Sequence, residues 1–388
     1  MLTDIKSLTQ AELEAQFAAW RQPAYRVAQL LQWLYVRRVT GWDAMTNLPG
    51  SLREKLRQTY SLRTLEPVRR QGSPVLRGPA MRDGGGRDTT QKFLWRLTDH
   101  SLIESVLIPA NPALYGEASD RHTLCVSTQV GCAYGCKFCA SGLDGWKRNL
   151  TPDEIVEQVL AIERLGPQSI VCSSEPDTAH SRLKTVDSRL VDNLVVMGMG
   201  EPLANYENLL KALRILNAPW GGGIGARKIT ISTSGLAPQI RKLADEPTQF
   251  RLAISLHGAT DEVRNKIMPV NRKYPLKQLL AACEYYQAQK GRMLTFEYIL
   301  LAGVNDSVDQ ARPLAALAKK LFAKVNLIPY NQVEGLPWER PVEEVCEAFL
   351  AALEKQKVTA TLRREKGHDI AAACGQLRLK TERELNTK

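Results

Sequence analysis

Three cysteines stand close together at positions 132, 136 and 139, in the string Cys132-Ala-Tyr-Gly-Cys136-Lys-Phe-Cys139. Three thiolates from one loop can bind three irons of a [4Fe–4S] cluster and leave the fourth iron without a protein ligand. Such an open iron can chelate a small molecule, much as an open zinc position holds a substrate. The spacing therefore indicates iron–sulfur chemistry with a small molecule bound at the cluster.

A structural zinc site is the alternative interpretation of the same cysteines. Zinc motifs usually pair two C-x-x-C halves, and the sequence contains no second half. Eight cysteines in 388 residues are also too few for a disulfide scaffold, so they are free, metal-bound or catalytic in a reducing compartment. The pattern favours the iron–sulfur cluster and leaves zinc open as a minor alternative.

The elements that must position this loop alternate between strand-like and helix-like segments from about residue 121 onward. The predicted strands are Leu124–Ser127, Leu194–Met197, Lys228–Ser232, Arg251–Leu256, Thr295–Leu300 and Lys324–Ile328. Stretches of helical pattern between them include Pro152–Leu165, Glu207–Leu216 and Leu276–Ala288. Six β/α repeats predict an α/β fold with a partial (β/α)6 TIM-type barrel, whose functional residues gather at the carboxyl ends of the strands. A doubly wound sheet would need a phosphate-binding glycine fingerprint, which we do not find in a convincing context.

Four parts of the chain differ in pattern. We predict a small N-terminal helical RNA-binding or accessory domain over 1–65, a β-rich connecting segment over 66–120, a core over 121–360 and a C-terminal segment over 361–388. In the connecting segment, an alternating run near Phe93 and an apolar run over 102–108 predict strands. A polar stretch at 166–190 interrupts the core as a surface insertion.

Charge and composition bear on the partner. The formal net charge is +11, and residues 1–100 carry 16 Lys and Arg against 9 Asp and Glu. A polyanion such as nucleic acid suits this balance, although an unspecific solvated surface explains the charge alone equally well. Cations that could form a phosphate-binding face are Arg37, Arg38, Arg53, Lys55, Arg57, Arg69 and Arg70. With no apolar run of about 18 residues, we expect a soluble cytoplasmic protein with no membrane partner.

The extended string from Cys125 to Cys139, Cys-Val-Ser-Thr-Gln-Val-Gly-Cys-Ala-Tyr-Gly-Cys-Lys-Phe-Cys, resembles the RlmN/Cfr family of radical S-adenosylmethionine RNA methyltransferases. Further segments that match are Arg148–Thr151, Met197–Pro202, Ser232–Gly235, Ser255–His257, Asn326–Asn331 and Gly367–Leu377. The resemblance runs in order from about residue 20 to 377.

The resemblance implies two cofactors and the residues that hold them. Cys132, Cys136 and Cys139 would bind the [4Fe–4S] cluster, and its open iron would chelate S-adenosylmethionine. The implied S-adenosylmethionine contacts are Gly200, Glu201, Ser232, Ser255, Leu256, His257 and Asn331. Taken singly, a serine or asparagine at a strand end is more often a cap or turn residue, and His257 suits the role of a core histidine.

The resemblance also implies a covalent route to the product. Cys374 would carry a methyl group taken from one S-adenosylmethionine, and a second one would supply the radical that activates it. Cys125 would be the resolving thiol that forms a disulfide with Cys374 as the product departs, and Glu104 would be the proton acceptor. A structural carboxylate on a strand face is the alternative for Glu104. Cys172, Cys283 and Cys346 match no family motif, and we interpret the last two as buried packing residues.

The function implied by this resemblance is formation of 2-methyladenosine in 23S rRNA and in tRNA beside the anticodon. Methylation of carbon 8 of the same rRNA adenosine, as in Cfr, is the closest alternative. A non-catalytic RNA-binding module with a structural metal, and another type of radical enzyme, are more distant hypotheses. We expect a monomer that receives electrons from a donor such as flavodoxin or ferredoxin.

Overall fold

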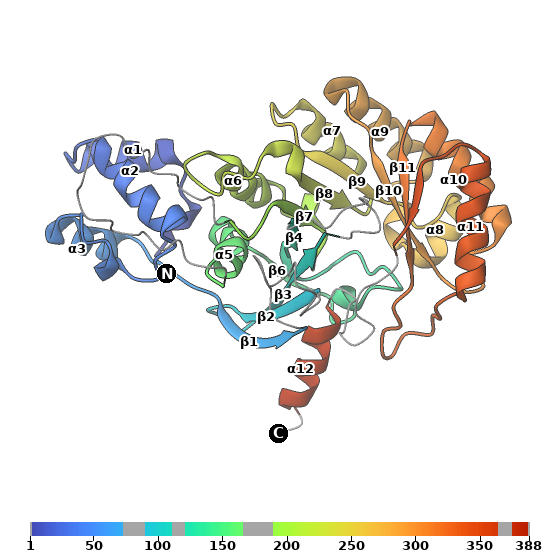
Figure 1. Ribbon diagram of the computed structural model, residues 1–388, viewed down its shortest axis with the longest axis horizontal. Helices are drawn as coiled ribbons and strands as arrows, with labels where there is room; N and C mark the ends of the chain where they lie inside the picture. Colours follow the sequence, from blue (N-terminus) through green and yellow to red (C-terminus); the bar gives the residue numbers. More distant parts are fainter. Residues whose placement is uncertain (1, 73–89, 111–120, 166–188, 364–374, 387–388) are drawn as a thin grey trace, which may run out of the picture.

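The computed structural model describes residues 2–72, 90–110, 121–165, 189–363 and 375–386. Within these ranges ten strands form one sheet in the order β1-β2-β3-β4-β7-β8-β9-β10-β11-β12 (Figure 1). Their bounds are β1 Glu66–Gln71, β2 Gln91–Arg96, β3 Leu102–Pro109, β4 His122–Cys125, β7 Asn193–Val196, β8 Ile229–Thr233, β9 Arg251–Ser255, β10 Thr295–Leu300, β11 Lys324–Pro329 and β12 Ala360–Leu362. A separate hairpin joins β5 Gln129–Gly131 to β6 Trp146–Asn149.

In the ten-stranded sheet, β4 and β7 to β12 are all parallel, and the six predicted core strands are confirmed among them. The sheet stays open, because β1 and β12 lie at its two ends, so the predicted partial barrel is also confirmed. The seventh parallel strand, β12, was not predicted from the sequence. It spans three residues, which is too short for a periodic pattern to show.

The predicted connecting segment contributes strands to this same sheet. β1 pairs antiparallel with β2, and β2 pairs antiparallel with β3. Because β3 also pairs antiparallel with β4, these three strands extend the barrel sheet without a break. The sequence predicts alternation in β2, yet its first five residues are all buried. Phe93 belongs to the main core, while Leu94 on the opposite face packs with Leu102 and Leu377. This small second cluster is buried because the C-terminal helix, which carries Leu377, covers that face of the sheet.

Two helix ends near the site carry capping signals in the sequence. Thr151 and Glu154 form a capping box around Pro152 at the start of α5, and Gly291 ends α9 in the left-handed conformation with φ +59°. The helix bounds are α1 Gln10–Ala19, α2 Tyr25–Leu31, α3 Gly50–Thr59, α5 Pro152–Glu163, α6 Tyr206–Asn217, α7 Ala237–Asp245, α8 Asp261–Ile267, α9 Leu276–Lys290, α10 Val308–Lys320, α11 Glu343–Lys355 and α12 Gln376–Asn386. The predicted helical stretches are confirmed in α5, α6 and α9.

The first three helices form a unit at one end of the molecule, and α12 lies beside β2 and β3 at the C-terminus (Figure 1). Ionic contacts join the helical unit to the core: Lys211 of α6 reaches Glu12 at 2.7 Å, and Lys6 lies 3.6 Å from Glu157 of α5. None of the described helices has the length and apolar character that a membrane crossing requires.

Candidate active site

The loop that carries the three clustered cysteines is closed by the hairpin β5–β6. The backbone N–H of Cys132 donates to the Gly145 carbonyl oxygen at 3.0 Å. Gly131 has φ +75°, and a Cβ there would lie 2.0 Å from the same carbonyl oxygen. Only glycine fits at that position, both for its backbone conformation and for the close approach. The loop is therefore fixed at its base by residues that lie close together in the sequence.

The buried cysteines of this loop are suited to bind a metal cation or a metal cluster. Burial raises the pKa of Cys132 to about 12, with further contributions from Cys139 and Glu201, and burial raises the pKa of Cys136 well above its ordinary value. Thiolates so placed require a cation beside them, and iron is a preferred thiolate partner. Within the described ranges no group of three or more His, Cys, Asp or Glu gathers around a point that could hold one metal ion. A [4Fe–4S] cluster binds each of its cysteine thiolates at a different iron.

Three contacts hold the outer side of the cysteine loop. The Lys137 N–H donates to the Ile267 carbonyl at 2.8 Å, and the indole N–H of Trp338 donates to the Lys137 carbonyl at 2.7 Å. The Phe138 ring meets the His257 ring edge-on, with centroids 4.9 Å apart. The loop is thereby tied to the segments that follow strands β9 and β11.

Gly200 and Glu201, two of the predicted S-adenosylmethionine contacts, follow β7 in the chain. The Glu201 N–H donates to Gln129 Oε1 at 2.8 Å, and a Cβ at Gly200, where φ is +99°, would lie 2.5 Å from Gln129 Cβ. The Glu201 carboxylate accepts N–H groups of Leu203 at 3.0 Å and Ser234 at 2.7 Å. Burial raises the pKa of Glu201, and the Ser234 hydrogen bonds oppose that rise. The carboxylate is preorganised beside the cysteine loop.

Sequence reasoning missed Gln129, which aligns this turn although it lies inside the string that carries the family resemblance. It also missed Arg264 on α8, a fully buried guanidinium that donates to the carbonyls of Ser234, at 3.0 Å, and Leu256. Arg264 thereby fixes the ends of β8 and β9 relative to each other. A lone arginine in an amphipathic helix gives no sequence signal for that role.

The structure brings together the predicted hydroxyl groups of β8 and β9. Ser232 Oγ and Ser255 Oγ lie 3.1 Å apart. Leu256 is fully buried directly after β9, and Asn331 follows β11, where Arg340 donates to its Oδ1 at 3.4 Å. These side chains occupy the carboxyl-terminal ends of successive parallel strands, which is the edge where a barrel binds ligands.

His257 is held as a neutral residue in an unusual conformation. Its φ is +53°, its Nδ1 accepts the Ile299 N–H at 3.0 Å, and its carbonyl accepts from Asn305 at 2.7 Å. Burial and the charge of Arg264 lower the pKa of His257 to about 3. The hydrogen bond at Nδ1 fits the core-histidine interpretation, and among the described residues none is made by Nε2.

A buried polar pair on β10 and β11 was not predicted. The Asn326 side chain donates to Glu297 Oε2 at 2.8 Å, and the two residues are register partners. Burial raises the pKa of Glu297, while the charges of Arg363 and Lys324 oppose the rise. The same register joins Glu297 to Ser255 on β9, so a row of polar side chains crosses three strands.

Glu104 on β3 contacts the segment that follows the predicted methyl carrier. Its Oε2 accepts the Gly375 N–H at 2.8 Å, and its Oε1 accepts the Arg378 N–H at 2.7 Å. Gly375 has φ +82°, and a Cβ there would lie 2.8 Å from the backbone nitrogen of Ser141, in the short helix Ala140–Gly142 directly after Cys139. Cys374 itself lies outside the described residues, as does Cys172.

The remaining cysteines separate by environment. Cys125 lies on β4, where it is buried and in register with Val106 of β3. Cys283 and Cys346 are fully buried in α9 and α11, which confirms their interpretation as packing residues.

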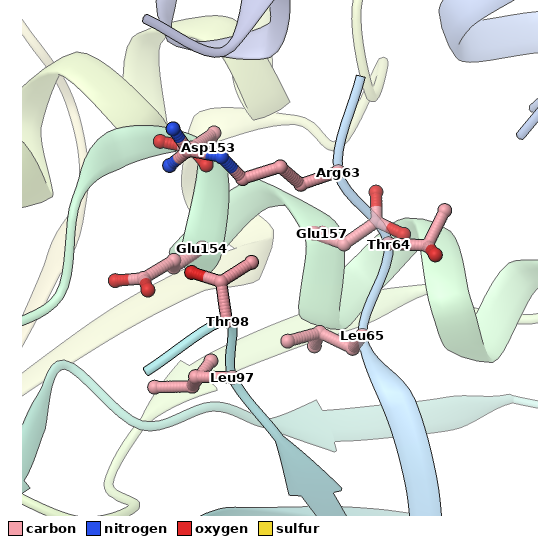
Figure 2. Close-up of a pocket in the computed structure, with 8 residues that line it drawn as sticks. All are labelled: Arg63, Thr64, Leu65, Leu97, Thr98, Asp153, Glu154 and Glu157. Carbon is pink, nitrogen blue, oxygen red and sulfur yellow. The ribbon is translucent and has the colours of Figure 1, made fainter. Parts of the chain in front are cut away.

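A pocket beside the N-terminal unit is distinct from this site. It is lined by Arg63, Thr64, Leu65, Leu97, Thr98, Asp153, Glu154 and Glu157 (Figure 2). Its carboxylates already have partners: Ser7 donates to Asp153 at 2.8 Å, Arg148 pairs with Glu154 at 2.8 Å, and Arg164 pairs with Glu157. The pocket lies where ion pairs and hydrogen bonds join the N-terminal unit to α5, and none of its lining residues belongs to the cysteine loop.

The predicted basic residues lie on several surfaces. Arg38 pairs with Glu163 at 3.1 Å and is mostly buried, so it connects the N-terminal unit to α5. Arg37, Lys55 and Arg57 are exposed on the helical unit, and Arg70 is exposed on β1. Arg37 and Lys55 lie over aromatic rings, at 4.3 Å and 4.9 Å from the ring centroids.

Comparison with known proteins defines the class that this fold and site represent. The profile of the Radical SAM superfamily matches residues 126–311, and that of the ribosomal RNA large subunit methyltransferase N-terminal domain matches residues 3–62. A radical SAM methyltransferase from Sphaerobacter thermophilus superposes with a TM-score of 0.81 at 42% identity, covering 96% of this chain and 98% of that one. The chain is an enzyme of the radical SAM methyltransferase class, which uses a [4Fe–4S] cluster and S-adenosylmethionine.

The relatives define the family within that class. A protein of Opitutus terrae, named probable dual-specificity RNA methyltransferase RlmN 3, is 52% identical over 97% of this chain and 95% of its own length. A protein of Akkermansia muciniphila, named probable dual-specificity RNA methyltransferase RlmN, is 49% identical over 99% and 98% respectively. This chain belongs to the RlmN family.

Proposed function

We propose that the enzyme forms 2-methyladenosine in 23S rRNA, at the peptidyl-transferase centre, and in tRNA, at the adenosine 3′ to the anticodon. The names of its relatives support an RNA substrate. The observation that carries the proposal is the packing of Gly375 against Ser141, because it brings the residue next to Cys374 onto the loop that holds the three cysteines.

Each group of residues has its own part in the proposed reaction. Cys132, Cys136 and Cys139 would hold the cluster, which together with bound S-adenosylmethionine supplies radical chemistry and the methyl group. The Glu201 carboxylate, fixed by two backbone N–H groups, would bind the ammonium of S-adenosylmethionine. The other proposed contacts are Gly200, Ser232, Ser255, Leu256, His257 and Asn331.

Cys374 would act as the methyl carrier. Its thiolate displaces the sulfonium at the methyl carbon, so a sulfur–carbon bond forms on Cys374 while the neutral thioether leaves. Carbon 2 of adenine is a poor nucleophile towards a sulfonium methyl. The methyl group would therefore be activated on Cys374 before it is transferred. Cys125 would release the product by forming a disulfide with Cys374, and Glu104 would accept a proton. The reaction would take place in the cytoplasm, on a monomer reduced by a flavodoxin or ferredoxin.

An anaerobic reaction of the reconstituted enzyme with unmodified 23S rRNA fragment and tRNA tests this proposal. With S-adenosylmethionine and reductant present, we expect 2-methyladenosine by nucleoside mass spectrometry, absent in Cys374→Ala and retained in the control Cys346→Ala. Formation of 8-methyladenosine would overturn the assignment to carbon 2. Cleavage of S-adenosylmethionine without formation of any methylated adenosine would overturn the proposal that these RNAs are the substrates.

A further inference from the structure

A buried lysine outside the proposed machinery lies next to Glu104. Lys92 on β2 is 0% exposed, and its Nζ is 3.0 Å from Glu104 Oε2. The side chain comes from the strand paired with β3, where Leu94 is the register partner of Glu104. Placing an ammonium in such an environment is costly unless a carboxylate compensates it, so the pair forms a unit.

The carboxylate of this pair caps a helix from another part of the chain. Glu104 accepts the N–H groups of Gly375 and Arg378, at 2.8 Å and 2.7 Å, which belong to the start of α12. The free N–H groups of a helix start favour a negative acceptor. An ionised Glu104 therefore serves α12 as an N-terminal cap supplied by a side chain 271 residues away from Gly375.

The same segment is held from its other side by the cysteine loop. Gly375 touches Ser141, and the Arg378 guanidinium pairs with Asp144 at 2.9 Å. Ser141 and Asp144 both lie between Cys139 and the end of the loop at Gly145. The residues directly after Cys374 are thus clamped between the β2–β3 hairpin and the cysteine loop.

We propose that Lys92 is a positioning residue for the methyl carrier: its ammonium orients the Glu104 carboxylate, which fixes Gly375, the residue next to Cys374, against the cysteine loop. The inference rests on the proposed function, in which Cys374 carries the methyl group. Lys92 touches neither S-adenosylmethionine nor RNA in this proposal, and acts through Glu104. A neutral side chain at position 92 would leave the buried carboxylate without its counter-charge and loosen the cap.

Methylation of Cys374 provides the test, because this half-reaction requires no RNA. We expect Lys92→Met to lower the rate of Cys374 methylation from labelled S-adenosylmethionine by about tenfold or more, since small displacements of a nucleophile have large effects on rate. Reductive cleavage of S-adenosylmethionine should stay within about twofold of the parent rate, because the cysteine loop is intact. Lys92→Arg, which keeps the charge, should restore part of the methylation.

Lys6→Met is the matched control. Lys6 is also buried and pairs with Asp4 at 3.1 Å, but it lies at the N-terminal junction. We expect this variant to lose thermal stability and to methylate Cys374 at the parent rate. If Lys6→Met slows methylation as much as Lys92→Met does, the effect reflects general destabilisation and the proposal fails.

Hydrogen exchange provides a readout that does not depend on the chemistry. In Lys92→Met, amides of the segment 375–378 should exchange faster, while those of the β4–β11 strands should keep the parent rate. Parent-like exchange together with parent-like methylation in Lys92→Met would overturn the positioning role. A parent protein that never methylates Cys374 would instead overturn the proposed function, and faster exchange in that segment would still be expected from the Lys92–Glu104–α12 contacts.

Discussion

The cysteine loop and the segment Gly375–Arg378 are positioned in different ways. We call the latter the carrier segment because it follows Cys374, the proposed methyl carrier. The loop closes on itself, through the Cys132 N–H to the Gly145 carbonyl and through the tight approach of Gly131 to the same group. The carrier segment depends on Glu104, whose partners lie more than 270 residues away along the chain. The cysteine loop is therefore held mainly by contacts within itself, whereas the carrier segment gains its contacts only once the sheet has folded.

The difference predicts that each region can be disabled without the other. Damage to the loop should abolish radical chemistry and leave the cap on α12 in place. Damage to the cap should spare reductive cleavage of S-adenosylmethionine and impair methyl transfer. Three changes test this separation, and a fourth tests His257 beside the loop; they follow in order of expected effect.

Cys136→Ala has the largest expected effect. With one of three thiolate ligands missing, the cluster should bind poorly, and 5′-deoxyadenosine formation should fall by at least about 10³-fold. Iron and sulfide content, together with visible absorbance, measure the cluster directly. The control is Cys283→Ala, at a buried thiol in α9, which should retain full iron content. A Cys136→Ala protein with parent iron content would contradict the assigned ligand.

Glu104→Gln has the next largest expected effect, and it alters the contacts of the carrier segment. The change leaves the Lys92 ammonium buried without its carboxylate, and we expect the free energy of unfolding to fall by about 3–5 kcal/mol. Urea unfolding measures this loss. The control Glu54→Gln removes an exposed pair with Arg57 and should change stability by about 0.5 kcal/mol or less. Equal effects in the two variants would show that the buried pair does not stabilise the folded protein more than an exposed pair does.

Gly131→Ala breaks the base of the cysteine loop. The new Cβ would lie 2.0 Å from the Gly145 carbonyl oxygen at φ +75°, so we expect a loss of about 2–4 kcal/mol in unfolding free energy. Gly135→Ala is a matched control, because Gly135 has φ +58° with nothing within 4 Å of its Cβ position. The left-handed conformation alone should cost that variant about 1–2 kcal/mol. A loss at Gly131 no greater than at Gly135 would mean that the close approach is not required.

His257→Asn should have the smallest effect of the four, measured as the change in stability between pH 7 and pH 5. The folded-state pKa of His257 is lowered to about 3 from 6.5, so the unfolded chain binds the proton between these values. The stability contributed by the neutral ring is present above pH 6.5 and is lost as the pH falls towards 3, by about 2 kcal/mol between pH 7 and pH 5. Asparagine tolerates positive φ and can accept the Ile299 N–H, and it does not titrate.

Unfolding of the parent and of His257→Asn at pH 7 and pH 5 measures this difference. We expect the variant to lose about 2 kcal/mol less than the parent over that interval. An identical acid dependence in the two proteins would place the titration elsewhere in the chain.

The sequence by itself determined the chemistry-bearing loop and the core that supports it. Cysteine spacing needs no tertiary information to indicate a cluster, and the period of buried residues predicted the parallel strands β4 and β7–β11, because both signals repeat over short distances. The buried packing role of Cys283 and Cys346 was predictable in the same way, from helix position and residue type.

Only the tertiary structure decided how the parts of the site meet. It joined β1–β3 to the barrel sheet, placed Gln129 beneath Glu201, and set Arg264 across the ends of β8 and β9. It also paired Lys92 with Glu104 under α12. Local propensity contains no information on such pairs, because their free energy arises only when distant strands and helices bury the charges together.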